Sequence, residues 1–159
     1  MRWGEGSMRW VRPLHTILAL FGGEPLTGGI EIGDGRRISY GSQTRGHRFL
    51  APAPFAVKGF ADYKAGLKDR FVLLEREERK KIILDGAKAL AEKHGLVLRD
   101  DPALLEEVCG LVENPVMLCG AFDPAFLDVP QEVLIATMRA NQKYFPLFDT
   151  SGRLASRFI

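Results

Sequence analysis

The order of apolar and polar positions predicts strands in the first third of the chain. Residues 11–21 form an apolar run that ends in two glycines, which is typical of a buried strand. Two shorter strands are expected at 29–32 and 37–40, and the Gly-Asp-Gly sequence between them favours a hairpin. After a segment rich in proline, which disfavours a helix, a further short strand is expected at 55–57.

The middle of the chain changes to helical periodicity. A short helix is expected at 61–67 and a long, amphipathic one at 74–94. The long helix has acidic residues in its first turn and basic residues in its last turn. Gly95 follows it, so the order of residues matches the helix dipole and a glycine C-cap. Its apolar stripe consists of Ile83, Ala87, Leu90 and Ala91.

Two more helices are predicted in the second half of the chain. One begins at Asp101, an N-cap residue followed by proline at the first helical position. Its expected buried side is formed by Leu104, Leu105, Val108, Leu111 and Val112. Residues 116–122 then predict a buried strand. The other helix begins at Pro130, and its expected inward positions are Val133, Leu134, Thr137 and Met138.

These elements predict the α+β class, with a mixed β-sheet packed with about three to four helices. The chain ends with a predicted strand, turn and strand, at 144–148, 149–152 and 154–159. Because strands and helices do not alternate regularly, a doubly wound nucleotide-binding fold is disfavoured. We expect one accessory domain over 1–159, in which 1–60 and 114–159 are rich in strands and 61–113 is helical.

Composition is ordinary for a globular protein, with 46% hydrophobic and 26% charged residues. No apolar run approaches the roughly 18–20 residues that a membrane span requires, so no membrane association is expected. The two cysteines, Cys109 and Cys119, have no partner at metal-ligand spacing. We expect both to be reduced thiols, which suits a cytoplasmic protein.

Positive charge is concentrated in the first 60 residues, which hold eight Lys or Arg against four Asp or Glu. Seven of the eight are arginine, whose planar guanidinium binds phosphates and stacks on bases. On these counts alone, an ordinary solvated surface with salt bridges is favoured over an RNA-binding surface. The charge distribution therefore permits an RNA-binding surface without requiring one.

Arginine and aromatic residues are interleaved in this cationic region. Cations for phosphates and planar faces for unpaired bases are what RNA binding needs, but Trp and Arg also anchor domain interfaces. The sequence leaves both interpretations open. The cluster consists of Arg2, Trp3, Arg9, Trp10, Arg12, Arg45, His47, Arg48 and Phe49. A second, weaker candidate contact is Gln142, Lys143 and Tyr144, which a helix C-terminus followed by a core strand also explains.

Catalytic motifs are not found in the sequence. Neither glycine pattern of phosphate-binding loops occurs, and no serine lies in a nucleophile elbow. His15 and His47, with Asp34 or Glu31, would form an acid–base or metal site only if the first strand and residues 44–50 are neighbours. A histidine in an apolar strand is more often part of a core. We therefore predict no catalytic residue and no metal ligand.

Several short motifs, taken together and in order, resemble the beta subunit of bacterial glycyl-tRNA synthetase. They cover nearly the whole chain. The motifs are Met1-Arg2-Trp3-Gly4, Arg12-Pro13-Leu14-His15, Arg45-Gly46-His47-Arg48-Phe49, Leu104-Leu105-Glu106-Glu107-Val108, the run from Val129 to Met138, Gln142-Lys143-Tyr144-Phe145-Pro146 and Arg157-Phe158-Ile159.

The resemblance implies a noncatalytic part of the N-terminal half of that subunit, truncated at both ends. The family works as an alpha-two beta-two assembly, in which the beta subunit binds and positions tRNA. ATP and Mg²⁺ act at the alpha subunit, so no cofactor is expected in this chain. The expected partners are the alpha subunit, the rest of the beta subunit and tRNA. Two alternatives stay open: an editing-like hydrolytic pocket around His15 and His47, and a purely structural interface between domains or subunits.

Overall fold

The computed structural model describes residues 8–12, 14–33 and 35–159. The chain divides between Leu74 and Glu75 into two compact units, here called unit 1 and unit 2, and each is described by itself. The α+β class is confirmed, because the described residues form mixed and antiparallel sheets together with four α-helices. The single accessory domain over 1–159 stays a prediction.

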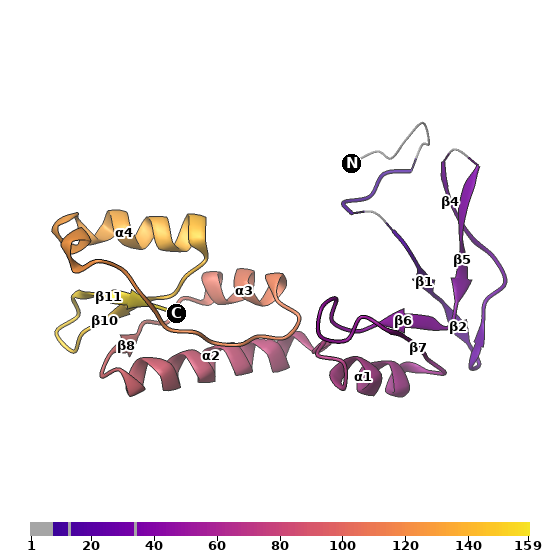
Figure 1. The fold of residues 1–159 in the computed structure, drawn as a ribbon, viewed down its shortest axis with the longest axis horizontal. Coiled ribbons are helices and arrows are strands. Elements are labelled where there is room, and N and C mark those ends of the chain that lie inside the picture. The colour runs from indigo at the N-terminus through magenta and orange to yellow at the C-terminus, as the bar shows by residue number, and fades with distance from the viewer. Residues whose placement is uncertain (1–7, 13, 34) are drawn as a thin grey trace. The chain divides into compact units, whose positions relative to one another are not determined.

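Unit 1 contains a three-stranded mixed sheet with the order β1-β5-β4 (Figure 1). Strand β1 (Ile17–Leu18) is parallel to β5 (Arg36–Gly41), and β4 (Gly29–Gly33) is antiparallel to β5. The hairpin expected from the Gly-Asp-Gly sequence is therefore confirmed, with each strand close to its expected bounds.

The prediction of one buried strand over 11–21 is wrong. The run is divided into β1 and β2 (Leu20–Phe21), and β2 turns back through two glycines to pair with β3 (Glu24–Pro25). Val11 and Phe21 are 76% and 81% exposed. A continuous apolar run is buried only where both faces of its strand are covered, and the described part of unit 1 has a single helix.

That helix, α1 (Phe60–Lys68), packs against the hairpin of β6 (Gln43–Arg45) and β7 (Pro54–Ala56). The ring of Phe55 lies so close to Gly66 that an added Cβ would be 2.4 Å from it. The guanidinium of Arg70 lies 4.2 Å from the centroid of the same ring. The expected strand at 55–57 and helix at 61–67 are confirmed, and they hold a small core that includes Val57 and Leu67.

Unit 2 is built on a four-stranded antiparallel sheet with the order β8-β10-β11-β9. Its strands lie between α4 on one side and α2 on the other (Figure 1). The elements are α2 (Arg76–Lys93), β8 (Val97–Leu98), α3 (Pro102–Leu111), β9 (Gly120–Ala121), the 3-10 helix η1 (Pro124–Asp128), α4 (Gln131–Thr137), the π-helix η2 (Met138–Gln142), β10 (Pro146–Phe148) and β11 (Leu154–Phe158).

Each face of this sheet carries its own apolar core. Phe145 packs on one face with residues of α2 and α3, including Ile83 and Cys109. Phe148 packs on the other face with Met138 and with partly buried residues of α4. Both faces of β10 are therefore covered, which explains why all three of its residues are buried.

The helix ends match the sequence signals. Gly95 has a left-handed φ of 66°, and the next N–H, of Leu96, donates to the carbonyl of Ala91 at 2.9 Å. This is the glycine C-cap expected after α2. The Asp101 side chain accepts a hydrogen bond from the N–H of Leu104 at 3.1 Å, which confirms the N-cap of α3.

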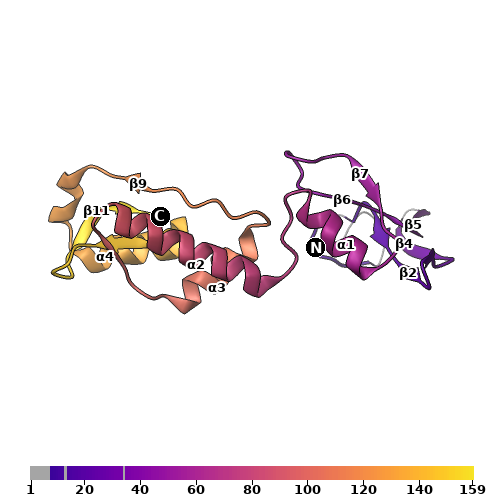
Figure 2. The same cartoon turned by 90° about the horizontal axis from the view of Figure 1, so that it is seen from below.

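The expectation of a buried strand at 116–122 is wrong. Only Gly120 and Ala121 pair as β9, and the segment before them runs along α2 (Figures 1 and 2). Met117 turns inward against Gly86, whereas Val116 and Leu118 are 71% and 75% exposed. The segment thus has one covered face. Three further positions expected inside, on helices, are also exposed, namely Leu111, Val133 and Thr137.

The turn between β10 and β11 is organised by the Asp149 carboxylate. It accepts hydrogen bonds from the hydroxyl and N–H of Ser151, at 2.6 and 2.9 Å, and from the N–H of Arg153 at 3.0 Å. The Arg153 guanidinium adds an ion pair at 3.1 Å. These hydrogen bonds lower the pKa of Asp149 from 3.8 to about 2. The bond from the Ser151 hydroxyl contributes most, and the bond from the N–H of Arg153 comes next.

We expect the Asp149 carboxyl to titrate near pH 2 in the folded chain. Because folding lowers this pKa, the stabilisation is fully present above about pH 4 and is lost as the pH falls through about 2. Carbon-13 chemical shifts measured against pH would report the midpoint. Ser151→Ala should move that midpoint towards 3.8, whereas a midpoint near 3.8 in the unaltered chain would contradict the geometry of this turn.

Candidate nucleic-acid interface

The arginine-rich motif expected to contact RNA forms the loop between β6 and β7, residues 45–53, here called the RGHRF loop. It is closed at its base by the Arg45 guanidinium, which donates to the carbonyl of Pro52 at 2.7 Å. A backbone hydrogen bond of 2.9 Å, from the N–H of Ala51 to the carbonyl of His47, also tightens the loop. Arg45 therefore stabilises the loop in addition to offering charge on its exposed side.

His47 organises the inside of the RGHRF loop. Its Nδ1 accepts hydrogen bonds from the N–H groups of Phe49 and Leu50, at 3.3 and 3.2 Å. The backbone N–H of His47 donates to the carbonyl of Arg70 just after α1, at 2.8 Å. Such local side-chain to backbone hydrogen bonds fix a turn in the way that Asx turns do. The structure therefore gives His47 a positioning role.

Gly46 brings the RGHRF loop into direct contact with the end of α1. A Cβ added at Gly46 would lie 2.2 Å from the Cβ of Arg70 and 2.7 Å from its carbonyl oxygen. Both neighbours are main-chain or near-main-chain atoms, which cannot move away cheaply. The close approach is thus possible only with glycine at this position.

The tip of the loop presents a cation next to an aromatic ring. Phe49 is 79% exposed and Leu50 is 56% exposed. The Arg48 guanidinium lies 5.5 Å from the centroid of the Phe49 ring. A rigid loop that holds an arginine beside an exposed ring can bind a phosphate and stack on an unpaired base.

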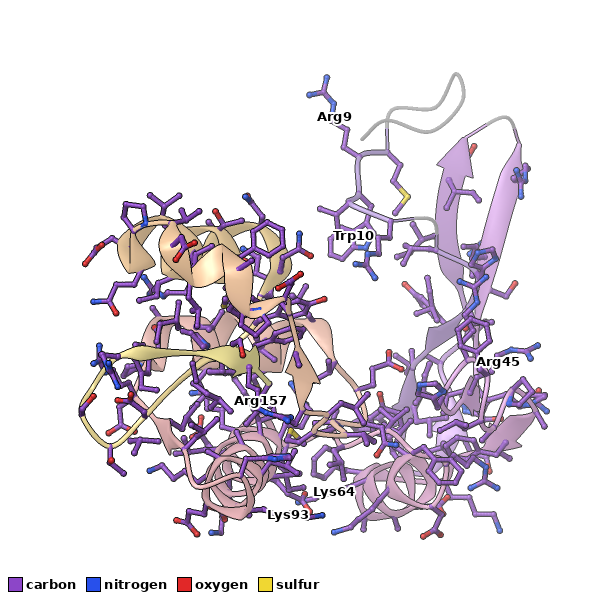
Figure 3. All side chains as sticks on the ribbon, turned by 60° about the vertical axis from the view of Figure 1, so that its left-hand side comes forward. Arg9, Trp10, Arg45, Lys64, Lys93 and Arg157 are labelled. Carbon is purple, nitrogen blue, oxygen red and sulfur yellow. The ribbon has the colours of Figure 1, made fainter. Side chains whose placement is uncertain are left out.

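Two described N-terminal members of the predicted cluster, Arg9 and Trp10, are not gathered around this loop. Arg2 and Trp3 lie outside the described residues, and Arg12 is exposed. Figure 3 shows Trp10, which is 52% exposed, well apart from Arg45 within unit 1. The RGHRF loop is therefore a separate candidate contact.

The second predicted contact, Gln142, Lys143 and Tyr144, lies at the C-terminal end of the π-helix η2 in unit 2. Lys143 has a left-handed φ of 60°, and its ammonium group pairs with Glu107 of α3 at 2.7 Å. The Tyr144 ring stacks on Phe158, with centroids 4.3 Å apart. Two of the three side chains therefore hold η2 and β10 against the rest of unit 2, and Gln142 is exposed.

A further link in the same region is the ion pair between Arg139 of η2 and Asp101, which also caps α3. The guanidinium binds the carboxylate through two nitrogens, and one of these contacts is 3.0 Å. Burial acts to raise the pKa of Asp101, but the hydrogen bonds from Arg139 and from the N–H of Leu104 outweigh it and lower the pKa. This pair fastens η2 to α3, and no local sequence signal predicts it.

His15 lies apart from the RGHRF loop, on an open groove of about 640 Å³ between β1 and β5. His47 does not line this groove, and its Nδ1 is already engaged in the loop. Asp34 lies outside the described residues, and Glu31 is exposed on β4 without lining the groove. Instead the groove brings His15 near Arg36 and Arg37, which the sequence analysis did not single out.

The described part of the chain presents neither a group of metal ligands nor a membrane-spanning helix. No group of three His, Cys, Asp or Glu residues there is arranged to hold a metal ion. No helix among those residues is long and apolar enough to cross a bilayer. Cys109 is buried, Cys119 is half-buried, and neither forms a disulfide with the other.

Comparisons with known proteins identify the family. A family model described as glycyl-tRNA synthetase beta subunit matches residues 1–159. A glycine–tRNA ligase beta subunit from Rhodospirillum centenum is 52% identical over 178 residues, which cover all of this chain and 25% of that protein. The beta subunits from Syntrophus aciditrophicus and Moorella thermoacetica are 47% and 42% identical, again over all of this chain and 22% of their own length.

This chain thus spans about a quarter of the length of the curated relatives it matches. The motif order seen in the sequence and the match over residues 1–159 agree with each other. The chain therefore belongs to the glycyl-tRNA synthetase beta subunit family.

Proposed function

We propose that this chain is a noncatalytic, tRNA-contacting part of glycine–tRNA ligase. In this role it supports the ATP-dependent attachment of glycine to its tRNA. The alpha subunit would supply the ATP and Mg²⁺ chemistry, and the rest of the beta subunit would continue the tRNA-binding surface. The relatives' names support the ligase, and the cationic unit 1 supports the RNA contact.

One observation carries this proposal, namely the rigid presentation of Arg48 and Phe49 at the tip of the RGHRF loop. His47, Gly46 and Arg45 hold the loop through contacts whose partners are main-chain atoms. The loop is therefore ordered before any ligand binds, so that little conformational entropy is lost on binding. An exposed ring beside a guanidinium suits an unpaired base next to a phosphate.

An editing-like pocket around His15 and His47 has less support. Such a pocket needs both imidazoles to face one cavity, within reach of the same substrate bond. His15 lines the groove beside β1, and His47 is engaged with its own loop. The tip of the RGHRF loop is therefore the better candidate for contact with tRNA.

The proposal predicts that an Arg48→Ala/Phe49→Ala variant of the assembled enzyme binds tRNA more weakly. Loss of one stacked base and one phosphate contact should lower the affinity by roughly 10- to 100-fold. The slope of log affinity against log salt should become shallower by about 0.7–0.9. Filter binding of the cognate tRNA over a salt series measures both quantities.

A matched control removes the same kind of exposed side chains from unit 2. Lys81→Ala/Phe126→Ala takes away a solvated helix cation and an exposed ring, and it should leave tRNA affinity unchanged. If the loop variant instead separates the subunits while tRNA affinity per assembled enzyme stays the same, the loop is a protein interface. That outcome would support a structural interface and contradict a contact between the loop and tRNA.

A further inference from the structure

The groove that contains His15 has the composition of an anion-binding surface. Besides His15 it is lined by two arginines, Arg36 and Arg37, and by the hydroxyl-bearing residues Thr16, Ser39 and Ser42. No carboxylate is among the described residues that line it. A ligand in the groove would therefore meet several donors and no carboxylate from a described residue.

The groove exists because β1 pairs with β5 over only two residues. The parallel register joins Ile17 to Tyr40 and Leu18 to Gly41, and the chain before Ile17 leaves the sheet (Figure 1). On its other edge β5 is paired with β4 along almost its full length. One edge of β5 is thus covered by β4, while the other opens into the groove.

The open edge of β5 also offers backbone groups. The carbonyl of Gly41 faces β1, where it accepts a hydrogen bond from the N–H of Ala19 at 3.2 Å. Along a strand the N–H and C=O of alternate residues point to the same edge. The backbone groups of Arg37 and the N–H of Ser39 therefore point to the edge of β5 that β1 leaves uncovered, whereas the carbonyl of Ser39 is used in the pairing of β5 with β1.

The two arginines of the groove differ in their surroundings from the cations of unit 2. Among the described residues no ion pair engages Arg36 or Arg37, and both are exposed. Glu31 is opposite Arg37 in the β4–β5 register, but it does not line the groove. In unit 2, by contrast, cations such as Lys143 and Arg139 are each paired with a carboxylate.

We propose that this groove binds the sugar–phosphate backbone of an unpaired RNA segment. This inference rests on the proposed function and adds a second contact surface to it. The guanidinium groups suit phosphates, and the hydroxyls of Thr16, Ser39 and Ser42 suit ribose hydroxyls. Ile17, Ile32 and Ile38 also line the groove and give it an apolar surface on which a base can rest.

The test uses the assembled enzyme with Arg36→Ala/Arg37→Ala in the beta subunit. Binding of cognate tRNA and of a short oligouridylate is measured over a salt series. Loss of two phosphate contacts should make the salt slope about 1.4 shallower and lower the affinity on the order of tenfold.

Two further variants test the chemistry of the groove. Ser42→Glu, which places a carboxylate in the groove, should weaken the binding of both RNAs without removing an arginine. Arg36→Lys/Arg37→Lys should retain most of the salt slope.

The control Lys81→Ala/Lys88→Ala removes the same charge from α2 and should leave both affinities unchanged. Unchanged affinity and salt slope in the Arg36→Ala/Arg37→Ala and Ser42→Glu enzymes would contradict the proposal that the groove binds RNA. If Arg48→Ala/Phe49→Ala still weakens tRNA binding in that case, the proposed function stands and only the groove is wrong. If neither pair of substitutions matters, both proposals fail together.

Discussion

Phe148→Ala is expected to destabilise unit 2 by about 3–5 kcal/mol. Phe148 is only 3% exposed, and it packs with Met138 and Leu154 between the sheet and α4. Arg99 covers the ring further, with its guanidinium 3.6 Å from the ring centroid. Removal of the ring would leave a cavity that these neighbours cannot fill without moving β10, so the lost transfer free energy and the cavity term add.

Urea unfolding of the 159-residue chain measures the loss of stability. Hydrogen exchange of the amides in β10 and β11 assigns that loss to unit 2. Phe126→Ala serves as the matched control, because that ring is 57% exposed on η1 and its loss should change stability by less than about 0.5 kcal/mol. Equal effects of the two substitutions would show that Phe148 does not occupy the core described above.

Gly46→Ala is expected to destabilise unit 1 by about 1–3 kcal/mol and to displace the RGHRF loop. The new methyl group would collide with Arg70, whose carbonyl is also the acceptor for the N–H of His47. The loop and α1 must separate to admit it. Separation breaks the hydrogen bond to His47 and releases the tip that carries Arg48 and Phe49.

Two measurements separate this effect from a general loss of stability. Gly41→Ala, in the same unit, adds a methyl group that meets nothing within 4 Å and should be nearly neutral. In the assembled enzyme, Gly46→Ala should reduce tRNA affinity towards that of Arg48→Ala/Phe49→Ala even at temperatures where unit 1 stays folded. Retention of full tRNA affinity would mean that the loop does not need its contact with α1.

Local signals predicted those elements whose hydrogen bonds are made between near neighbours. Gly-Asp-Gly between two short apolar segments was enough for the β4–β5 hairpin, because the turn sets the register. The long helix α2 followed from its apolar spacing, its charges and Gly95, and α3 from Asp101. The resemblance to the glycyl-tRNA synthetase beta subunit also needed only the order of motifs, and the comparisons confirmed the family.

Burial of the apolar runs could not be predicted in the same way. Residues 11–21 and 116–122 are as apolar as many core strands, yet each is covered on one face at most. Whether a second layer covers a strand depends on helices far away in the sequence. For 116–122 that layer is α2, whose Gly86 lies against Met117.

The candidate site shows the same division. The family, the α+β class and the cationic character of unit 1 could be predicted from the amino-acid sequence, because they depend on composition, motif order and local periodicity. The role of each arginine, by contrast, is visible only in the folded chain. Arg139 is joined to Asp101 across 38 residues, whereas Arg36 and Arg37 line a groove that opens where β1 leaves β5. Contacts between distant segments set these roles, and residue spacing carries no information about them.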